Sequence, residues 1–332
     1  MTTLTETIDP DNDASTASEE NAEHRFFADV LKKAQSLGPL PTAVVYPLSD
    51  VALLGAVEAA QIGLLQPVLI GPTTAIQTKA DTLGLDLGGC TFHDIENDVA
   101  AAQQATKLAR EGQVKALMKG SLHTDHFMGA IVSRQEGLRT ERRLSHVYVM
   151  DVPTYPKPLF ISDAAINIYP DLMVKRDIVQ NAIDLAIACG TPNPKVAILS
   201  AFETVKSKLP STLEAAALCK MADRGQITGG ELDGPLAFDN AISVDAARTK
   251  GIVSNVAGNA DILIAPDLEA GNILAKQLSF LANAKAAGIV LGARVPVILT
   301  SRADTKATRL ASCALACLLN AYQQQQLDGD HV

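Results

Sequence analysis

Short apolar runs alternate with segments of helical periodicity along most of this chain. The run at 42–46 has the β-branched composition of a buried strand, and residues 50–62 follow with the period of a helix. Strands that alternate with helices usually form parallel sheets. We therefore expect an α/β fold, with parallel-rich sheets covered by helices on both faces. The pattern predicts further strands at 67–70, 116–119, 146–151, 158–162, 195–200, 262–265 and 295–299, and helices at 98–111, 177–190 and 211–224.

Two interruptions divide the pattern. Residues 1–23 hold seven acidic residues and no lysine or arginine, which predicts a disordered acidic tail. Pro153 and Pro156 interrupt the alternation, and we expect the chain to return to the first sheet near Gly292. A ligand would then bind in the cleft between two lobes. The expected domains are domain I at 24–152 plus 293–332 and domain II at 153–292.

The composition excludes several classes of protein. Of the 332 residues, 47% are hydrophobic and 20% are charged, which is typical of a globular protein. The formal charge of −9 comes largely from residues 1–23, so we expect no nucleic-acid partner. No apolar run is long enough for a membrane span, so we expect no membrane partner.

The cysteines are scattered, and we expect small buried thiols in the reducing cytoplasm rather than disulfides or a metal site. They are Cys90, Cys189, Cys219, Cys313 and Cys317.

The last third of the chain places polar groups directly after two predicted strands. Asp267 follows the strand at 262–265, and Ser301, Arg302 and Asp304 follow the strand at 295–299. Open α/β sheets bind ligands at the carboxyl ends of their parallel strands, so we expect these loops to face one crevice. Acyl transfer between phosphate and a thiol needs a base, a cation and an oxyanion donor, which Asp304, Arg302 and Ser301 can supply in that order. As a structural alternative, Ser301 caps a helix and Asp304 lies at its N-terminus.

Basic residues follow the predicted strand at 116–119. Lys119 and Gly120 can bring a point charge and backbone N–H groups to an anion, although an ordinary strand-to-helix turn explains them equally well. The segment 115–143 also contains Arg139 among four arginines, which suit the phosphates of a CoA-like ligand. A solvated or dimer-facing surface is the alternative. Three histidines also suggest a metal site, but no carboxylate completes a metal-site pattern, so we predict no metal. They are His123, His126 and His146.

Carboxylate and amide side chains after other apolar segments are further candidates for substrate binding. Asp163 and Asn167 follow one strand, and Asp239 follows a turn. Gly271 and Asn272 are predicted to begin a helix whose backbone N–H groups point at an anion. A plain N-cap is the alternative for that pair.

The order of these segments resembles the phosphate acetyltransferase and phosphate butyryltransferase family over roughly residues 40–320. The resemblance implies a two-lobed fold similar to that of isocitrate and isopropylmalate dehydrogenases, and a homodimer. It implies reversible transfer of an acyl group between CoA and orthophosphate, by direct attack and without a covalent enzyme intermediate. CoA would be a co-substrate, acyl phosphate the other product, and no cofactor would be permanently bound. The matching segments are 117–120, 137–140, 144–147, 160–163, 199–201, 212–225, 233–240, 266–272 and 299–304.

The resemblance maps the family's serine–arginine pair onto Ser301 and Arg302. This chain has Thr308 where acetyltransferases carry the catalytic aspartate, and its nearest carboxylate is Asp304, as in the butyryl type. It also has Gly129 where relatives carry an arginine. The acyl chain stays open between acetyl, propionyl and butyryl. The competing hypotheses are a non-catalytic acyl-CoA-binding protein and a metal-dependent NAD(P) dehydrogenase on the same fold.

Overall fold

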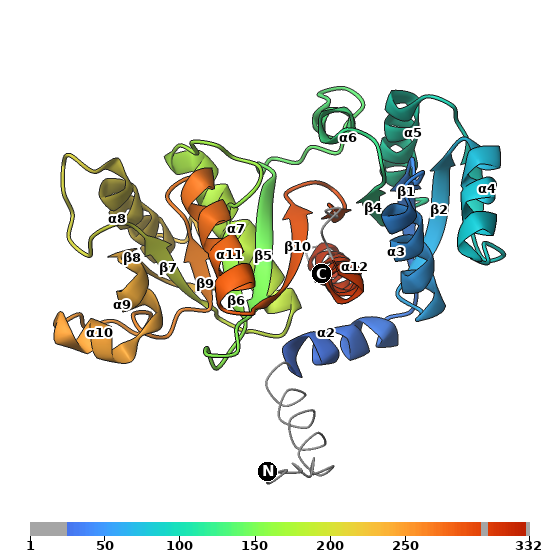
Figure 1. Cartoon of the computed structure of the whole chain (residues 1–332). Helices are drawn as coiled ribbons and strands as arrows, with labels where there is room; N and C mark the ends of the chain where they lie inside the picture. Colours follow the sequence, from blue (N-terminus) through green and yellow to red (C-terminus); the bar gives the residue numbers. More distant parts are fainter. Residues whose placement is uncertain (1–24, 300–304, 330–332) are drawn as a thin grey trace, which may run out of the picture.

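The computed structural model describes residues 25–299 and 305–329, so the expected tail at 1–23 lies outside the described residues. The described chain forms two lobes that share one continuous sheet (Figure 1). The strands are β1 Leu40–Val45, β2 Leu65–Gly71, β3 Thr91–Asp94, β4 Ala116–Lys119, β5 Ser145–Asp151, β6 Leu159–Ser162, β7 Lys195–Leu199, β8 Glu231–Leu236, β9 Ile262–Ile264, β10 Lys285–Leu291 and β11 Val297–Ile298.

The sheet consists of two parallel blocks joined by antiparallel strands. Among the described residues its order is β3-β2-β1-β4-β11-β10-β5-β6-β9-β7-β8. One parallel block consists of β3, β2, β1, β4 and β11. The other consists of β6, β9, β7 and β8. Between them, β10 is antiparallel to β11 and β5, and β5 is antiparallel to β6. The parallel-rich α/β class is confirmed, but the two blocks run in opposite directions.

Helices cover both faces of this sheet. On one face a single apolar cluster joins α3, α12, α7 and α8 to the strands of both lobes. On the other face there are two separate clusters, one beneath α5 and α6 and one beneath α9, α10 and α11. The helices are α2 Arg25–Ser36, α3 Asp50–Gln61, α4 Thr73–Leu83, α5 Asp98–Arg110, α6 Thr124–Val132, α7 Leu172–Ala188, α8 Pro210–Asp223, α9 Phe238–Ile242, α10 Val244–Thr249, α11 Leu268–Leu281 and α12 Lys306–Gly329.

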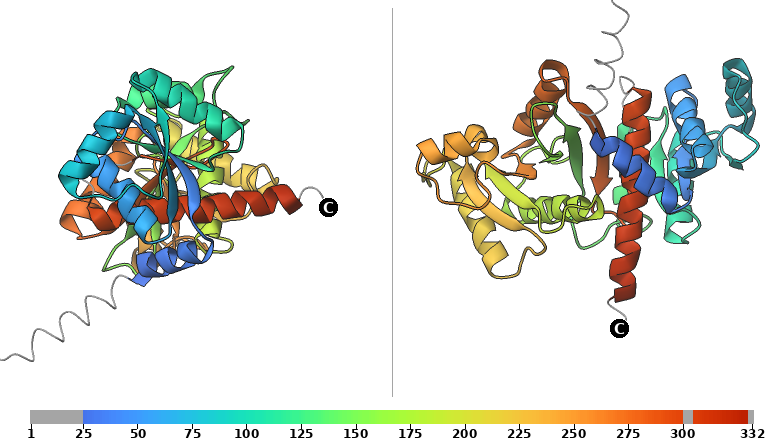
Figure 2. Two further views of the ribbon diagram at one scale, coloured as in Figure 1. Left: turned by 90° about the vertical axis from the view of Figure 1, so that its right-hand side faces the viewer. Right: turned by 90° about the horizontal axis from the view of Figure 1, so that it is seen from below.

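Helix α12 lies across the junction of the lobes. It packs against α2, α3, α7 and β10, and therefore contacts both lobes. Figure 2 shows that its last turns extend beyond the body of the molecule. The division into domains I and II stays a prediction, since the sheet and α12 both continue through the proposed boundary.

Several elements differ from the expected pattern. Strand β4 has the predicted bounds, but β10 was not predicted, because Gly288 interrupts an apolar run that follows a helix directly. Helix α7 begins at Leu172, earlier than expected, because the Asp171 side chain accepts a 2.9 Å hydrogen bond from the Val174 N–H and caps it.

The predicted burial is confirmed for Cys189, Cys313 and Cys317, which lie in the large apolar cluster. Burial raises the pKa of Cys189 and of Cys317 to about 12, so these thiols are protonated at neutral pH. Cys90 and Cys219 are half-buried. Within the described ranges, no helix combines the length and the hydropathy that a membrane span requires.

Candidate active site

On one face of the sheet the apolar clusters of the two lobes are separate. Gly288 on β10 lies directly opposite Tyr148 on β5, so both belong to the same face as His146. A Cβ atom on Gly288 would lie 2.8 Å from His146 Nε2. The glycine therefore makes room for the imidazole ring, at a place where the apolar clusters of the two lobes are separate.

Asp163 organises the loop that follows β6. Its Oδ1 accepts hydrogen bonds from the N–H groups of Ala165 (2.9 Å) and Ile166 (3.1 Å). Its Oδ2 accepts bonds from Asn167, at 3.2 Å from the backbone N–H and at 2.5 Å from Nδ2. Four donors satisfy the acceptor capacity of an ionised carboxylate, so this buried side chain holds the loop in shape.

The beginning of α11 packs onto this loop. A Cβ atom on Gly271 would lie 2.2 Å from the backbone oxygen of Asp163, so the close approach requires glycine. Asn272 Nδ2 donates a 3.0 Å hydrogen bond to the backbone oxygen of Ala164. The structure thus brings together four predicted residues: Asp163, Asn167, Gly271 and Asn272.

The predicted role of the Gly271 and Asn272 backbone is wrong. The helix begins earlier, at Leu268, with Asp267 as its N-cap accepting a 2.9 Å bond from the Ala270 N–H. Gly271 N–H already donates to the Asp267 carbonyl at 3.2 Å. These two residues therefore lie inside the first turns of α11, where their contribution is packing and a side-chain hydrogen bond.

His146 lies beneath the same loop and is buried. Burial lowers its pKa to about 4, and the nearby Asp163 carboxylate acts in the opposite direction. The ring packs edge-on against Tyr148, with 4.4 Å between the ring centroids. Its Nδ1 atom has no hydrogen-bond partner among the described residues. The imidazole is therefore neutral at pH 7. The sequence did not assign His146 a role in the site, because a buried histidine inside an apolar strand carries no local signal of one.

Lys119 and Gly120 lie in the other lobe, where β4 ends. The N–H groups of Gly120 and Ser121 donate to the carbonyls of Val45 and Tyr46, both at 2.9 Å. A Cβ atom on Gly120 would lie 2.2 Å from the Val45 oxygen. The expected cradle of backbone N–H groups is therefore wrong, and the glycine is needed for packing against β1. Lys119 is half-buried and remains the cation at this strand end.

Two other candidates lie apart from this group. Arg139 is exposed and pairs through its backbone with Ala293, on a connection between the lobes. Asp239 is exposed on α9, where its Oδ2 lies 3.5 Å from Lys250 Nζ. Because β6, β9, β7 and β8 are parallel, Asp239 shares their carboxyl edge with Asp163, although β9 and β7 separate the two parent strands.

The predicted catalytic residues Ser301, Arg302 and Asp304 lie outside the described residues. Thr305 Oγ1 accepts a 3.2 Å hydrogen bond from the Thr308 N–H, so Thr305 caps α12. The alternative in which Ser301 is that cap is therefore wrong. Strands β9 and β11 run in opposite directions with three strands between them, so the sheet itself does not make their following loops neighbours.

Comparison with known proteins shows the family. The model of the family described as Phosphate acetyl/butaryl transferase matches residues 97–317. The chain belongs to this transferase family. A phosphate acetyltransferase from Rhizobium meliloti is 59% identical over 292 residues, which cover 88% of this chain and 92% of the relative. A phosphate butyryltransferase from Clostridium acetobutylicum is 39% identical over 295 residues, which cover 89% of this chain and 98% of the relative.

The fold agrees with the family. A branched-chain phosphotransacylase from Enterococcus faecalis V583, solved as a crystal structure, matches with a TM-score of 0.72 and 27% identity. The match covers 85% of this chain and 99% of that one. The predicted family and the two-lobed α/β fold are therefore both confirmed.

This member of the family has a pocket of about 780 Å³ between α5 and α6. Lys107 and Arg110 on α5 provide cations, Ile95 and Val99 provide apolar surface, and Gly129 lies on the α6 side. A Cβ atom on Gly129 would meet nothing within 4 Å, so a side chain can begin here without a clash. In the part of the chain that the structure describes, no three His, Cys, Asp or Glu side chains gather closely enough to hold a metal ion.

Proposed function

We propose that the protein is a phosphate acyltransferase that acts where the lobes meet. The CoA thiolate attacks the carbonyl carbon of an acyl phosphate, a C–S bond forms, the C–O bond to phosphate breaks, and orthophosphate leaves. The reverse reaction returns free CoA, and no covalent enzyme intermediate forms. The family match over residues 97–317 is the observation that carries this proposal. Members of this family are acyltransferases, so the chain is an enzyme rather than a binding protein.

We assign the chemical roles to the loop before α12. Asp304 takes the thiol proton, Arg302 holds the departing phosphate, and Ser301 donates a hydrogen bond to the developing oxyanion. Lys119 at the end of β4 adds a second positive charge for phosphate. Asp163 acts on its own loop rather than on substrate, since both of its oxygens already accept two hydrogen bonds.

We further propose that the pocket between α5 and α6 takes the nucleotide end of CoA. Its volume of about 780 Å³ is in the range of roughly 300–1,000 Å³ found for small-molecule sites. Lys107 and Arg110 suit the phosphates, and Ile95 and Val99 suit the flat adenine ring. Arg110 also pairs with Glu136 at 2.6 Å, which fixes the guanidinium at the pocket wall.

Acetyl is the acyl group that we propose as preferred. The relative that is 59% identical is a phosphate acetyltransferase, and the butyryltransferase relative is 39% identical. A methylene in an apolar pocket changes the transition-state energy by only about 1 kcal/mol, or about fivefold in rate. Propionyl-CoA and butyryl-CoA are therefore expected as slower substrates.

The decisive experiment measures phosphate-dependent release of CoA from acetyl-, propionyl- and butyryl-CoA with a thiol reagent. Release that requires orthophosphate supports the proposal and ranks the substrates. CoA binding without release from any of the three would favour the acyl-CoA-binding protein instead. Arg302→Ala should abolish most turnover in folded protein, and unchanged turnover would remove Arg302 from the mechanism. Asp304→Asn should alter the pH–rate profile if Asp304 is the base.

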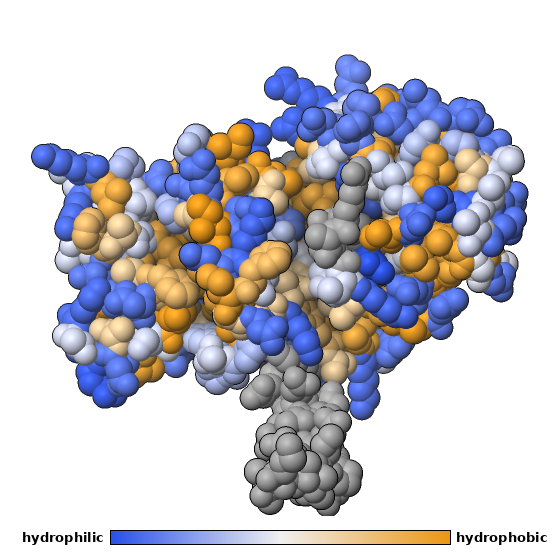
Figure 3. Space-filling view, in the orientation of Figure 1, coloured by the Kyte–Doolittle hydropathy of each residue, from blue (hydrophilic) through white to orange (hydrophobic). Residues whose placement is uncertain are grey.

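We propose a homodimer that uses the surface of α11. Phe280 and Leu281 are 83% and 84% exposed, and Ile273 on the same helix is 57% exposed. Figure 3 shows apolar side chains gathered over α11. Exposed apolar patches of this kind mark interaction surfaces. Phe280→Glu should shift the protein from dimer to monomer in analytical ultracentrifugation, and a monomeric starting protein would contradict the proposal.

We also propose a cytoplasmic location. Three of the five cysteines are buried as free thiols, which is usual in a reducing compartment.

A further inference from the structure

Two connections between the lobes run side by side. The first leads from α6 to β5 and the second from β10 to β11. Arg139 and Ala293 form an antiparallel bridge between them, and Arg294 N–H donates to the Leu138 carbonyl at 2.9 Å. Thr140 Oγ1 donates to the Gly292 carbonyl at 2.8 Å. The lobes are therefore joined by a paired double connection.

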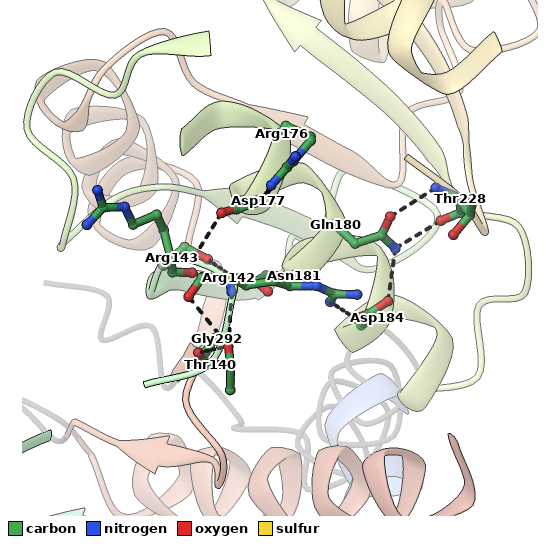
Figure 4. A network of polar contacts seen from close by, with 11 residues as sticks. Thr140, Arg142, Arg143, Arg176, Asp177, Gln180, Asn181, Asp184, Thr228 and Gly292 are labelled. Carbon is green, nitrogen blue, oxygen red and sulfur yellow. Dashed lines mark hydrogen bonds and ion pairs between the residues drawn. The ribbon is translucent and has the colours of Figure 1, made fainter. Parts of the chain in front are cut away.

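One face of α7 anchors the first connection. Asp177 accepts a 2.9 Å hydrogen bond from the Arg143 N–H, and Asn181 Nδ2 donates to the Arg143 carbonyl at 3.0 Å. Asp184, on the same face of the helix, forms an ion pair with Arg142. Figure 4 shows Arg142 and Gln180 reaching Asp184 from two sides. The backbone that carries Arg142 is therefore held in place.

Gln180 extends this network to Thr228, in the connection between α8 and β8. Its Oε1 accepts from the Thr228 N–H at 2.9 Å, and its Nε2 donates to the Thr228 carbonyl at 3.0 Å and to Asp184 at 3.1 Å. The Asp184 carboxylate is thus shared between an amide and a guanidinium. Asp184 therefore balances the positive charge of Arg142.

A pocket of about 590 Å³ lies between this network, the second connection and the last turns of α12. We call it the junction pocket. Its charged lining residues are the two arginines Arg142 and Arg294 and one acid, Asp184. Among the described residues, no acidic group forms an ion pair with Arg294, which is exposed. Tyr322, Gln323 and Gln326 of α12 supply further hydrogen-bonding groups on the opposite wall.

We propose that the junction pocket binds a small organic anion that carries a carboxylate or a phosphate group. The excess of one positive charge selects for an anion, and a guanidinium presents its N–H groups in the fork that matches such oxygens. The glutamines and the tyrosine recognise polar groups on the rest of the ligand, while Ala293 and Leu327 provide apolar surface. The volume lies within the range of roughly 300–1,000 Å³ for small-molecule sites.

The position of the pocket makes it separate from the proposed transfer site. It is built by both connections between the lobes, by α7 and by the last turns of α12, whereas the proposed catalytic residues precede the first turn of α12. A ligand there contacts parts of the chain that meet only in the folded, two-lobed molecule. Its binding therefore stabilises the folded protein, by an amount that grows with the logarithm of the free ligand concentration above Kd.

The experiment measures binding of two probes, succinate and glycerol 2-phosphate, to the full chain by calorimetry and by the rise in Tm at low ionic strength. Succinate tests the carboxylate and glycerol 2-phosphate tests the phosphate ester. Arg294→Gln should raise the Kd of the more tightly bound probe at least about tenfold, because a charge-assisted hydrogen bond is lost. Gln326→Ala, on an exposed turn of α12, should also raise the Kd of that probe. Arg248→Gln, a surface arginine on α10, is the matched control and should bind like the wild type.

Arg302→Ala distinguishes this pocket from the proposed phosphate site, since it should leave probe binding unchanged while it removes turnover. Arg294→Gln should have wild-type turnover without probe. Three results would overturn the proposal: neither probe binds at millimolar concentration, Arg294→Gln binds as tightly as the wild type, or Arg302→Ala abolishes probe binding.

Discussion

Asn272 donates a 3.0 Å hydrogen bond from its side-chain nitrogen to the backbone oxygen of Ala164. This bond ties the first turns of α11 to the loop that Asp163 organises, and it joins residues that are far apart in the sequence. Together with the close approach of Gly271 to the Asp163 carbonyl, it makes the loop and the helix one structural unit. The first two predictions test that unit.

Replacing Asn272 with alanine should loosen the Asp163 loop. The change removes one side-chain hydrogen bond and leaves the Ala164 carbonyl without that donor, which should cost about 1–2 kcal/mol of unfolding free energy. We expect a lower kcat/KM for phosphate-dependent CoA release, measured alongside urea unfolding. Ser279→Ala is the control, because its hydroxyl donates only to Ala275 within α11. Equal activity of the two variants would contradict a role for the Asn272 bond in the site.

Replacing Gly271 with alanine should be strongly destabilising. The added Cβ would lie 2.2 Å from a backbone oxygen, so α11 or the loop must move, at a cost of at least about 2 kcal/mol. Gly129→Ala is the matched comparison, because a Cβ there meets nothing within 4 Å and lies inside α6. It should stabilise the protein by roughly 0.5–1 kcal/mol through helix propensity. The midpoints of urea unfolding of the two variants should therefore move in opposite directions.

His146 should make stability depend on pH in mildly acidic solution. Its pKa is lowered from 6.5 to about 4 by burial, so between these values the unfolded chain binds a proton that the folded protein does not. Stability should therefore fall as the pH falls from 6.5 to 4, by as much as about 3 kcal/mol from this group.

The variant His146→Asn should lose this part of the pH dependence, measured by urea unfolding at pH 7, 5.5 and 4.5. Tyr148→Phe retains the histidine and the ring contact and should keep the wild-type slope. An unchanged slope in His146→Asn would show that other groups cause the acid sensitivity.

Replacing Gly129 with arginine tests the proposed site for the CoA nucleotide. A Cβ atom at this position meets nothing within 4 Å. The arginine would add a third cation to a pocket that Lys107 and Arg110 line together with the acids Asp125 and Glu136. We expect KM for acetyl-CoA to fall severalfold, because one charge-assisted contact to phosphate is worth about 1.5 kcal/mol or more. The turnover number at saturation should change little. Gly129→Gln, which adds length without charge, is the control, and an equal effect of both variants would contradict phosphate binding at this place.

Local patterns in the sequence were enough to predict most strands but not their neighbours. The run at 116–119 is β4 as predicted, because four apolar or half-buried residues in a row suit a strand covered on both faces. The segment 285–291 did not reveal β10, since its glycine weakens the strand signal and is explained only by the His146 ring across the ladder. Likewise, the local sequence around the glycines at 120 and 271 predicts anion sites, whereas each glycine is required by a backbone oxygen that the fold places against it.

The sequence by itself determined the α/β class and the family, because these depend on the apolar period along the chain and on short motifs. The tertiary structure decided that Asp163, Asn167, Gly271 and Asn272 form one group, and that Lys119 belongs to the opposite lobe. It also decided that β9 and β11 run in opposite directions, so their following loops do not leave the same edge of one parallel block. The physical reason is that strand pairing and helix packing join residues far apart in the chain. Such contacts depend on the whole assembly, and none of the local segments carries them alone.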